Sequence, residues 1–192
     1  MKKILLAAAI LMTATPAFAA DTYTIDPSHT AVEWSLSHFG FSNPSGKFYA
    51  KEGTLVLDQA NPENSRIEVS FIINDMVTGI PKLDEHLKGA DFFDTAKFPT
   101  ATFKSTKIVR TGDTTAEVTG DLTLHGVTKP VTLRMILNKI GDNMMKLKTA
   151  GFSGITTVKR SDFGMNSFLP GLGDEVSLVI ESEATLADVQ TH

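Results

Sequence analysis

The sequence predicts an all-β domain, a single antiparallel up-and-down β-barrel of about eight strands with a short helix between two of the strands. Three observations predict this fold. Apolar and polar residues alternate with period two in many short segments, turn residues separate these segments at fairly regular intervals, and the connections between them are short. Short connections favour antiparallel pairing, and successive hairpins within one domain favour an up-and-down barrel.

The first 19 residues are predicted to be an export signal rather than part of the fold. Two lysines precede an apolar run, residues 4–12, which is shorter than the about 20 residues that cross a bilayer. An A-x-A cleavage signal ends at Ala19, so we expect a mature chain that begins at Ala20 in the periplasm. The alternative, an N-terminal membrane anchor, is disfavoured by the shortness of the apolar run.

The remaining chain, residues 20–192, has a length that suits one domain with a sizeable core. Cleavage would remove two lysines and no acidic residue, which changes the formal net charge from −4 to −6. A mildly acidic domain lacks the electrostatic footprint of proteins that bind nucleic acid or anionic membrane surfaces. The chain has no cysteine, which excludes thiol redox chemistry and thiolate metal sites, and no later hydrophobic run suggests a membrane span.

Each predicted strand has one apolar face. In the first strand Glu33 and Ser35 separate the apolar positions, and later strands repeat this arrangement. Such alternation places one set of side chains inside a barrel and the other set in solvent. Outside the central hairpin, the apolar faces in chain order are Val32, Trp34 and Leu36 with His38; Phe48 and Leu55; Ile67, Val69, Phe71 and Ile73; Ala101 and Phe103; Met145 and Leu147; and Val176, Leu178 and Ile180.

Residues 118–138 carry the clearest hairpin pattern. The alternation breaks at His125-Gly126 and then resumes, which predicts a turn there, with Gly126 free to take a positive φ. Pro130 has no backbone N–H, so we expect it at the start of the second strand. The apolar face of this hairpin comprises Val118, Gly120, Leu122, Leu124, Val131, Leu133, Met135 and Leu137.

One segment, residues 81–89, is predicted to be a short helix. Pro81 suits the first helical position, acidic residues follow early, and Gly89 suits the end. A helix between strands would cover an opening or an edge of the barrel.

Five sequence blocks resemble the YceI-like family of periplasmic, lipocalin-like proteins, and together they cover essentially the whole mature chain. Because the five blocks occur in the family's order, the resemblance is highly specific. The blocks are Asp26-Pro27-Ser28-His29; Gly46-Lys47-Phe48; residues 91–103, which begin Asp91-Phe92-Phe93-Asp94; residues 120–133; and Lys159-Arg160-Ser161-Asp162-Phe163-Gly164.

The resemblance implies a lipocalin-like barrel whose long apolar cavity holds an isoprenoid or another long-chain amphiphile, often in a homodimer, with no agreed enzyme activity. We therefore expect a periplasmic binding protein that sequesters or carries such a ligand, without a cofactor. Alternation by itself is the same in a hollow barrel and in a solid one. Strands of about nine residues would give a lumen about 30 Å long.

The predicted ligand-binding residues are the apolar positions of the inward faces and two polar residues. His38 would donate to a polar head group or be satisfied by backbone carbonyls. Arg160 would hold an anionic head group or form an ion pair with Asp162. The full set is Val32, Trp34, Leu36, His38, Phe71, Ile73, Phe103, Leu122, Leu124, Leu133, Met135, Arg160, Leu178 and Ile180.

Two other functions stay open. A lipid-acting enzyme would need a nucleophile or base paired with a second titrating group, and the sequence shows no such pairing, no serine-nucleophile motif and no histidine spacing typical of a metal site. A stress-related interaction protein with a solid barrel would need a large apolar patch on its outer face, whereas the predicted outward positions are polar.

Overall fold

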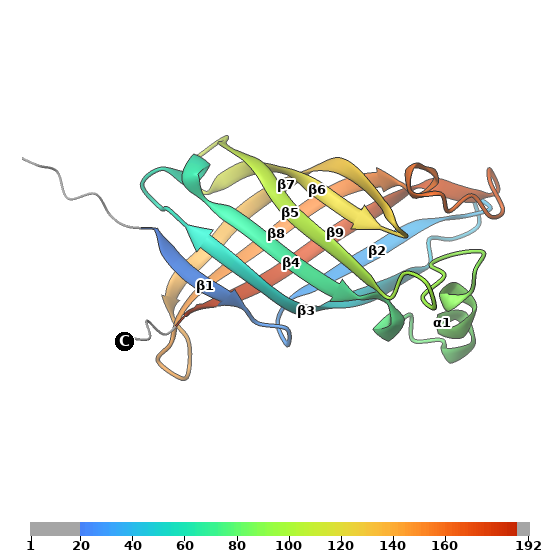
Figure 1. The fold of residues 1–192 in the computed structure, drawn as a ribbon, viewed down its shortest axis with the longest axis horizontal. Helices are drawn as coiled ribbons and strands as arrows, with labels where there is room; N and C mark the ends of the chain where they lie inside the picture. Colours follow the sequence, from blue (N-terminus) through green and yellow to red (C-terminus); the bar gives the residue numbers. More distant parts are fainter. Residues whose placement is uncertain (1–19, 188–192) are drawn as a thin grey trace, which may run out of the picture.

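The period-two segments form nine strands and one α-helix in the computed structural model, which describes residues 20–187 (Figure 1). The predicted signal segment lies outside the described residues. Within residues 20–187, no helix has the length and apolar character needed to cross a membrane. The elements are β1 (Asp21–Ile25), β2 (Ala31–His38), β3 (Ser45–Leu57), η1 (Pro62–Asn64), β4 (Arg66–Ile72), η2 (Ile73–Asp75), α1 (Pro81–Lys88), β5 (Thr100–Arg110), β6 (Thr115–Leu124), β7 (Val127–Asp142), β8 (Lys148–Lys159), η3 (Arg160–Phe163) and β9 (Leu172–Leu186).

The nine strands occupy eight positions in a closed antiparallel barrel. From β2 to β9 each strand pairs with the next one along the chain, and β9 pairs back with β2. β1 pairs with the same two neighbours as β2, namely β3 and β9, so β1 and β2 share one position. The predicted up-and-down barrel of about eight strands is therefore confirmed.

β1 and β2 are separate strands because the chain leaves the sheet between them. Ile25 pairs with Ala184, and Ala31 pairs with Glu181. Between these two pairs the chain from β1 to β2 advances by six residues, whereas β9 advances by three. The three extra residues form a loop. The sequence pattern of β1 was missed because the strand is short and this loop interrupts its alternation.

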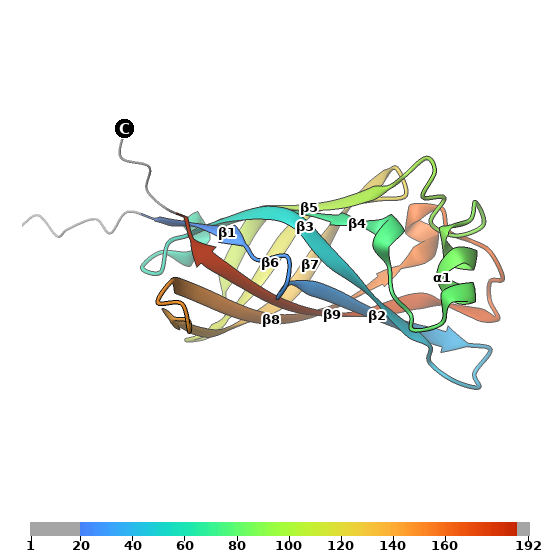
Figure 2. The same cartoon turned by 90° about the horizontal axis from the view of Figure 1, so that it is seen from below.

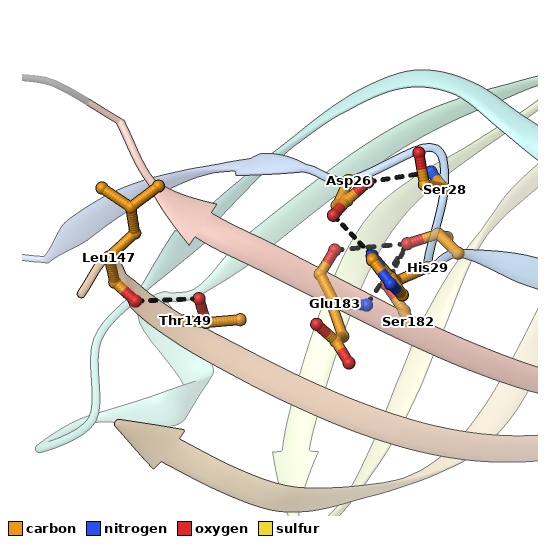
Figure 3. A network of polar contacts seen from close by, with 8 residues as sticks. Asp26, Ser28, His29, Leu147, Thr149, Ser182 and Glu183 are labelled. Carbon is orange, nitrogen blue, oxygen red and sulfur yellow. Dashed lines mark hydrogen bonds and ion pairs between the residues drawn. The ribbon is translucent and has the colours of Figure 1, made fainter. Parts of the chain in front are cut away.

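Side-chain hydrogen bonds stabilise the loop between β1 and β2 (Figure 3). The Thr30 hydroxyl accepts from the Glu183 N–H at 3.3 Å and donates to the Glu183 carbonyl oxygen at 3.2 Å, so it replaces a rung of the ladder. Asp26 accepts from the Ser28 N–H at 2.8 Å and from His29 Nδ1 at 2.7 Å. The hydrogen bond between the two side chains lowers the pKa of Asp26 and raises the pKa of His29.

Bulges in four strand pairings reverse the alternation along single strands. In β5, Phe103 and Ile108 are both buried although they lie five residues apart, because the register shifts between Ser105 and Lys107. In β3, Ala50 and Leu55 are both buried for the same reason. Such bulges bend strands and increase their twist, which a closed barrel requires.

The turn between β6 and β7 has the predicted residues, whereas the prediction for Pro130 was wrong. His125 and Gly126 have φ values of 51° and 73°, which are those of a two-residue hairpin turn. Pro130 is the fourth residue of β7 and pairs with Asp121. It is tolerated there because pairing of β7 with β8 begins only at Arg134, so no ladder bond on that side is lost.

Helix α1 begins and ends at the predicted residues and lies over one end of the barrel (Figure 2). Pro81 is its first residue and Gly89 its C-cap. The Asp84 carboxylate accepts from the Thr78 N–H at 2.8 Å and from the Thr78 hydroxyl at 2.6 Å, which anchors the segment that leads into the helix. The helix therefore covers an opening, as the sequence indicated.

Two expectations were wrong, that Met145 and Leu147 belong to an inward strand face and that the outward positions are polar. Met145 and Leu147 lie in the turn before β8 and are exposed, because β8 begins only at Lys148. The outward positions are not uniformly polar either, since Ile136, Ile155 and Val179 are each about half exposed on β7, β8 and β9. Period-two alternation assigns a residue to a face but does not guarantee that the outer face is polar.

The contact between Asp26 and His29 predicts a pH-dependent stabilisation of the loop. Because the pKa of His29 is raised, the contribution is complete below the unfolded value of 6.5 and is lost as pH rises through the folded pKa. The pKa of Asp26 is lowered, so the contribution is also lost as pH falls through a value below 3.8. By NMR, His29 should titrate above 6.5 and should shift down in Asp26→Asn; an unchanged His29 titration in that variant would contradict the assignment.

Candidate functional site: an apolar cavity in one half of the barrel

The half of the barrel that contains β1 is packed solid. Tyr23, Ala150 and Ala184 have no solvent exposure, and Ile25 is 3% exposed. Small residues on β8 and β9 make room for the Tyr23 ring, which fills the centre of the barrel at this level. This end is therefore closed.

The other half is hollow. A cavity of about 580 Å³ lies between the strands, and every one of the eight barrel positions contributes to its wall. Inward apolar residues in this half, such as Leu36, Leu133 and Leu178, border this cavity and are only partly buried. The strand residues of the wall are Val32, Trp34, Leu36, His38, Phe48, Val69, Phe71, Ala101, Phe103, Leu122, Leu124, Val131, Leu133, Val158, Val176, Leu178 and Ile180, with Leu172 at the start of β9.

The floor of the cavity is formed where the hollow half meets the packed half. Phe103 lines the cavity and also packs with the buried residues Ile108 and Val118 beneath it. From Val32 to His38 the wall follows six residue steps of β2, about 20 Å along the strand. This wall is shorter than the about 30 Å expected for a barrel that is hollow throughout, because side chains fill the other part of the barrel.

Three segments surround the mouth of the cavity. They are the turn between β2 and β3, helix α1 with the residues that follow it, and η3 with the loop that leads to β9 (Figures 1 and 2). They add mainly apolar residues to the lining. These residues are Phe39 and Pro44; Leu83, Leu87, Phe92 and Phe93; and Phe163, Met165 and Phe168.

The polar side chains of the lining all lie at the mouth. They are His38 at the end of β2, Ser42 in the following turn, His86 on α1 and Arg160 in η3. The deeper wall is apolar. The cavity thus has an apolar interior and a polar opening, which is the pattern that an amphiphile with one polar end requires.

Arg160 holds the loop that follows it. The side chain is 4% exposed and donates to the carbonyl oxygens of Met165, Ser167, Leu172 and Gly173 at 2.7–2.9 Å. Burial lowers the pKa of Arg160, and the nearby Asp174 carboxylate opposes that effect. The expected ion pair with Asp162 does not form among the described residues, because the guanidinium donates its hydrogen bonds to four backbone carbonyl oxygens instead.

Two aromatic rings of the wall pack directly against glycine residues. A Cβ atom at Gly46 would lie 2.6 Å from the Trp34 ring, and one at Gly120 would lie 2.5 Å from the Phe103 ring. Each ring lies over a glycine of the neighbouring strand, where there is no side chain. The ring can therefore lie close to the backbone of that strand. The Trp34 indole nitrogen is buried there and has no hydrogen-bond partner among the described residues.

The structure brings thirteen of the fourteen predicted residues to the cavity. Met135 is the exception; it faces inward, but it packs over Gly154 below the floor. Alternation assigned its face correctly and carried no information about its depth. The thirteen are Val32, Trp34, Leu36, His38, Phe71, Ile73, Phe103, Leu122, Leu124, Leu133, Arg160, Leu178 and Ile180.

Sequence reasoning missed two kinds of lining residue. Some share an inward face that had been recognised, and the same alternation indicates them: Val69, Ala101, Val131 and Val176. Others, including Phe39, Met165 and Phe168, come from loops, and Phe163 comes from the short helix η3, where periodicity gives no signal. Within residues 20–187 no group of three or more His, Asp or Glu side chains is placed to hold a metal ion.

Comparisons with known proteins identify similar sequences and folds. The YceI-like domain family matches residues 23–184. A UPF0312 protein of Pseudomonas syringae pv. tomato is 40% identical over 195 positions, which cover 99% of this chain and 98% of that protein. BcnA of Burkholderia cenocepacia has a similar structure, with a TM-score of 0.74 and 24% identity over 84% of this chain and 99% of that chain. So does a polyisoprenoid binding domain from Saccharophagus degradans, with a TM-score of 0.65 and 13% identity over 86% of this chain and 98% of that chain.

The contrast between the two halves predicts that a Leu→Ala substitution lowers the free energy of unfolding more in the packed half than in the hollow half. Leu55→Ala removes a buried side chain from the packed half and should lower the free energy of unfolding by about 2–5 kcal/mol. Leu178→Ala should cost less than about 1.5 kcal/mol, because its side chain already borders a cavity and no new void forms. Urea unfolding of both variants tests this; equal losses would mean that the barrel is solid throughout.

Proposed function

Because the chain belongs to the YceI-like domain family, we propose that it is a periplasmic binding protein that sequesters or carries one long apolar amphiphile in the cavity. The observation that carries the proposal is the cavity of about 580 Å³, in which inward apolar side chains from all eight strand positions face a lumen. A folded protein gains stability by burying such residues, so their exposure to a lumen is explained by a ligand that covers them. The predicted export signal supports the periplasm as the place of action.

The ligand would enter with its apolar end first. The floor at Phe103 is apolar and closed by packed side chains, whereas His38, Ser42 and His86 lie at the mouth. A polar head group at the mouth would keep its contact with water and with these side chains. A head group at the floor would lose hydration without a partner, which is costly.

The electrostatics of the mouth favour a neutral or anionic head group. Arg160 brings a buried positive charge to the lining. The nearby Asp174 carboxylate interacts with that charge, but it forms no ion pair with Arg160 among residues 20–187 and does not itself line the cavity. Its four bonds to carbonyls leave one N–H of the guanidinium for a further acceptor. A cationic head group would be repelled at short range.

An isoprenoid is the ligand class that we propose first. One protein of similar structure is a polyisoprenoid binding domain, and the cavity is almost wholly apolar in its depth. Each methylene group that leaves water contributes about 0.8 kcal/mol, so affinity should increase with chain length until the floor is reached. This proposal needs no catalytic step and no cofactor.

Association of two chains is also a proposal. The exposed residues Ile136, Ile155 and Val179 lie on three adjacent strands, and Ile155 pairs directly with Val179. An apolar patch on a sheet face is a common basis of contact between subunits. Light scattering of the purified protein measures whether one chain or two are present.

The only tryptophan supplies a direct measurement of binding. Trp34 borders the cavity, so its emission should shift or be quenched when a long-chain isoprenoid alcohol is added to delipidated protein, with saturation near one ligand per chain. Short alcohols should have little effect, because they bury few methylene groups. Leu36→Glu should abolish the response by placing a charge in the apolar wall.

Ser177→Glu is the matched control for this titration. Ser177 is exposed on the outer face and pairs with Ser35, the neighbour of Leu36. The variant therefore introduces the same charge near Leu36 but on the outer side of the barrel wall. Its response should equal that of the wild type. If the wild-type emission does not respond to any hydrophobic ligand, the binding proposal is wrong.

A further inference from the structure

The mouth of the cavity is surrounded by exposed apolar side chains, which we call the rim. They lie in three segments, residues 39–44, 76–81 and 163–173. Large apolar side chains that remain this exposed in a folded protein commonly mark an interaction surface when they are grouped. The rim comprises Phe39 (51% exposed), Phe41 (90%), Val77 (48%), Ile80 (57%) and Phe168 (58%).

Contacts hold the three segments beside one another at the mouth. The backbones of Val77 and Lys47 exchange two hydrogen bonds, at 2.8 and 3.0 Å, which join the second segment to the start of β3, just after the first segment. The Phe39 N–H donates to the Gly171 carbonyl oxygen at 2.8 Å, which joins the first segment to the third. Phe168 stacks on Phe92, just after α1, with ring centroids 6.1 Å apart. Phe39 and Phe168 also line the cavity, so the rim is continuous with the apolar interior.

Backbone geometry holds two of these rings at the mouth. Phe39 and Phe168 both have a positive φ, 52° and 62°, a region that bulky residues rarely occupy. Residues kept in such conformations are concentrated at functional sites, where the surrounding structure fixes them. The Phe39 ring is held against Gly171, where a side chain would collide with it.

The rim carries no formal charge. None of the residues in the three segments is Asp, Glu, Lys or Arg, although 21% of the whole chain is charged. These three segments can leave water without desolvating a charge of their own. The exposed charges of the adjacent helix α1, Lys82 and Glu85, have opposite signs, so they give the mouth no strong preference for an anionic partner.

We propose that the rim docks the protein on a zwitterionic lipid bilayer, with the cavity mouth facing the membrane. The inference rests on the proposed function, because an amphiphile that resides in a membrane must pass between the bilayer and the cavity. If the mouth is seated among the lipid head groups, the apolar chain moves between two apolar environments and avoids water. Exposed aromatic and aliphatic side chains, in segments without charged residues, are the side chains that enter that interfacial layer.

A bilayer fits the rim better than a second copy of the chain. The exposed side chains proposed above to join two copies, Ile136, Ile155 and Val179, lie on the outer face of the sheet, and none of them belongs to the rim. A contact between two rims would also close both cavities. A small, projecting and uncharged surface suits reversible attachment to lipid.

The test measures binding to phosphatidylcholine vesicles by flotation, with protein that contains residues 20–192 and therefore the whole barrel. In Phe41→Ser/Ile80→Ser the vesicle-bound fraction should fall at least tenfold, since neither residue lines the cavity. The matched control, Met144→Ser/Met145→Ser, removes two exposed apolar residues at the opposite end and should bind like the wild type. Added salt should have little effect on wild-type binding.

The Trp34 titration, carried out without vesicles, separates this proposal from the proposed function. An unchanged ligand response in Phe41→Ser/Ile80→Ser shows that the cavity is intact, so that a loss of vesicle binding is assigned to the rim. Wild-type protein that does not float with vesicles, or equal losses in the two double variants, would overturn the proposal. So would a wild-type dimer that Phe41→Ser/Ile80→Ser dissociates, because the rim would then be a contact between copies.

Discussion

Closure of the barrel along β9 is the constraint on which the rest of the structure depends. β9 pairs with β8 on one side and with β1 and β2 on the other, so the sheet has no free edge. The chain departs from β9 between β1 and β2, and the Thr30 hydroxyl bonds both backbone groups of Glu183 at that point. Without this closure there would be neither an enclosed lumen nor a separate mouth.

With eight strand positions, a barrel is just wide enough to be filled by side chains or to hold one ligand, so the inward residues decide between the two. In the closed half, Tyr23 projects into the space left by Ala150 and Ala184. In the open half, Trp34 and Phe103 lie over glycines of the neighbouring strands. The same barrel therefore has a packed half, which supplies stability, and a hollow half, which is available for binding.

Much of this arrangement could be predicted from sequence because alternation is a local property. Leu122 and Leu124 were placed correctly since β6 pairs regularly with β7 through a two-residue turn. Depth along the barrel is not local, so Met135 was assigned to the cavity although it lies beneath the floor. Bulges also break the periodicity, as between Ser105 and Lys107, and no sequence signal marks where they occur.

The mouth was the least predictable region because loops determine it. The sequence suggested Asp162 as the partner of Arg160, but the guanidinium bonds to carbonyls that only the folded loop brings together. The exposure of Phe41 is likewise a property of the assembled rim. Local patterns thus defined the walls, whereas the chemistry at the opening required the three-dimensional structure.

Native mass spectrometry of protein released gently from its own compartment tests the central claim most directly. The account predicts a population with one apolar amphiphile per chain, whose mass identifies the ligand and which is lost on delipidation. A protein that always has the mass of the bare chain, and that takes up no long-chain amphiphile afterwards, would contradict it.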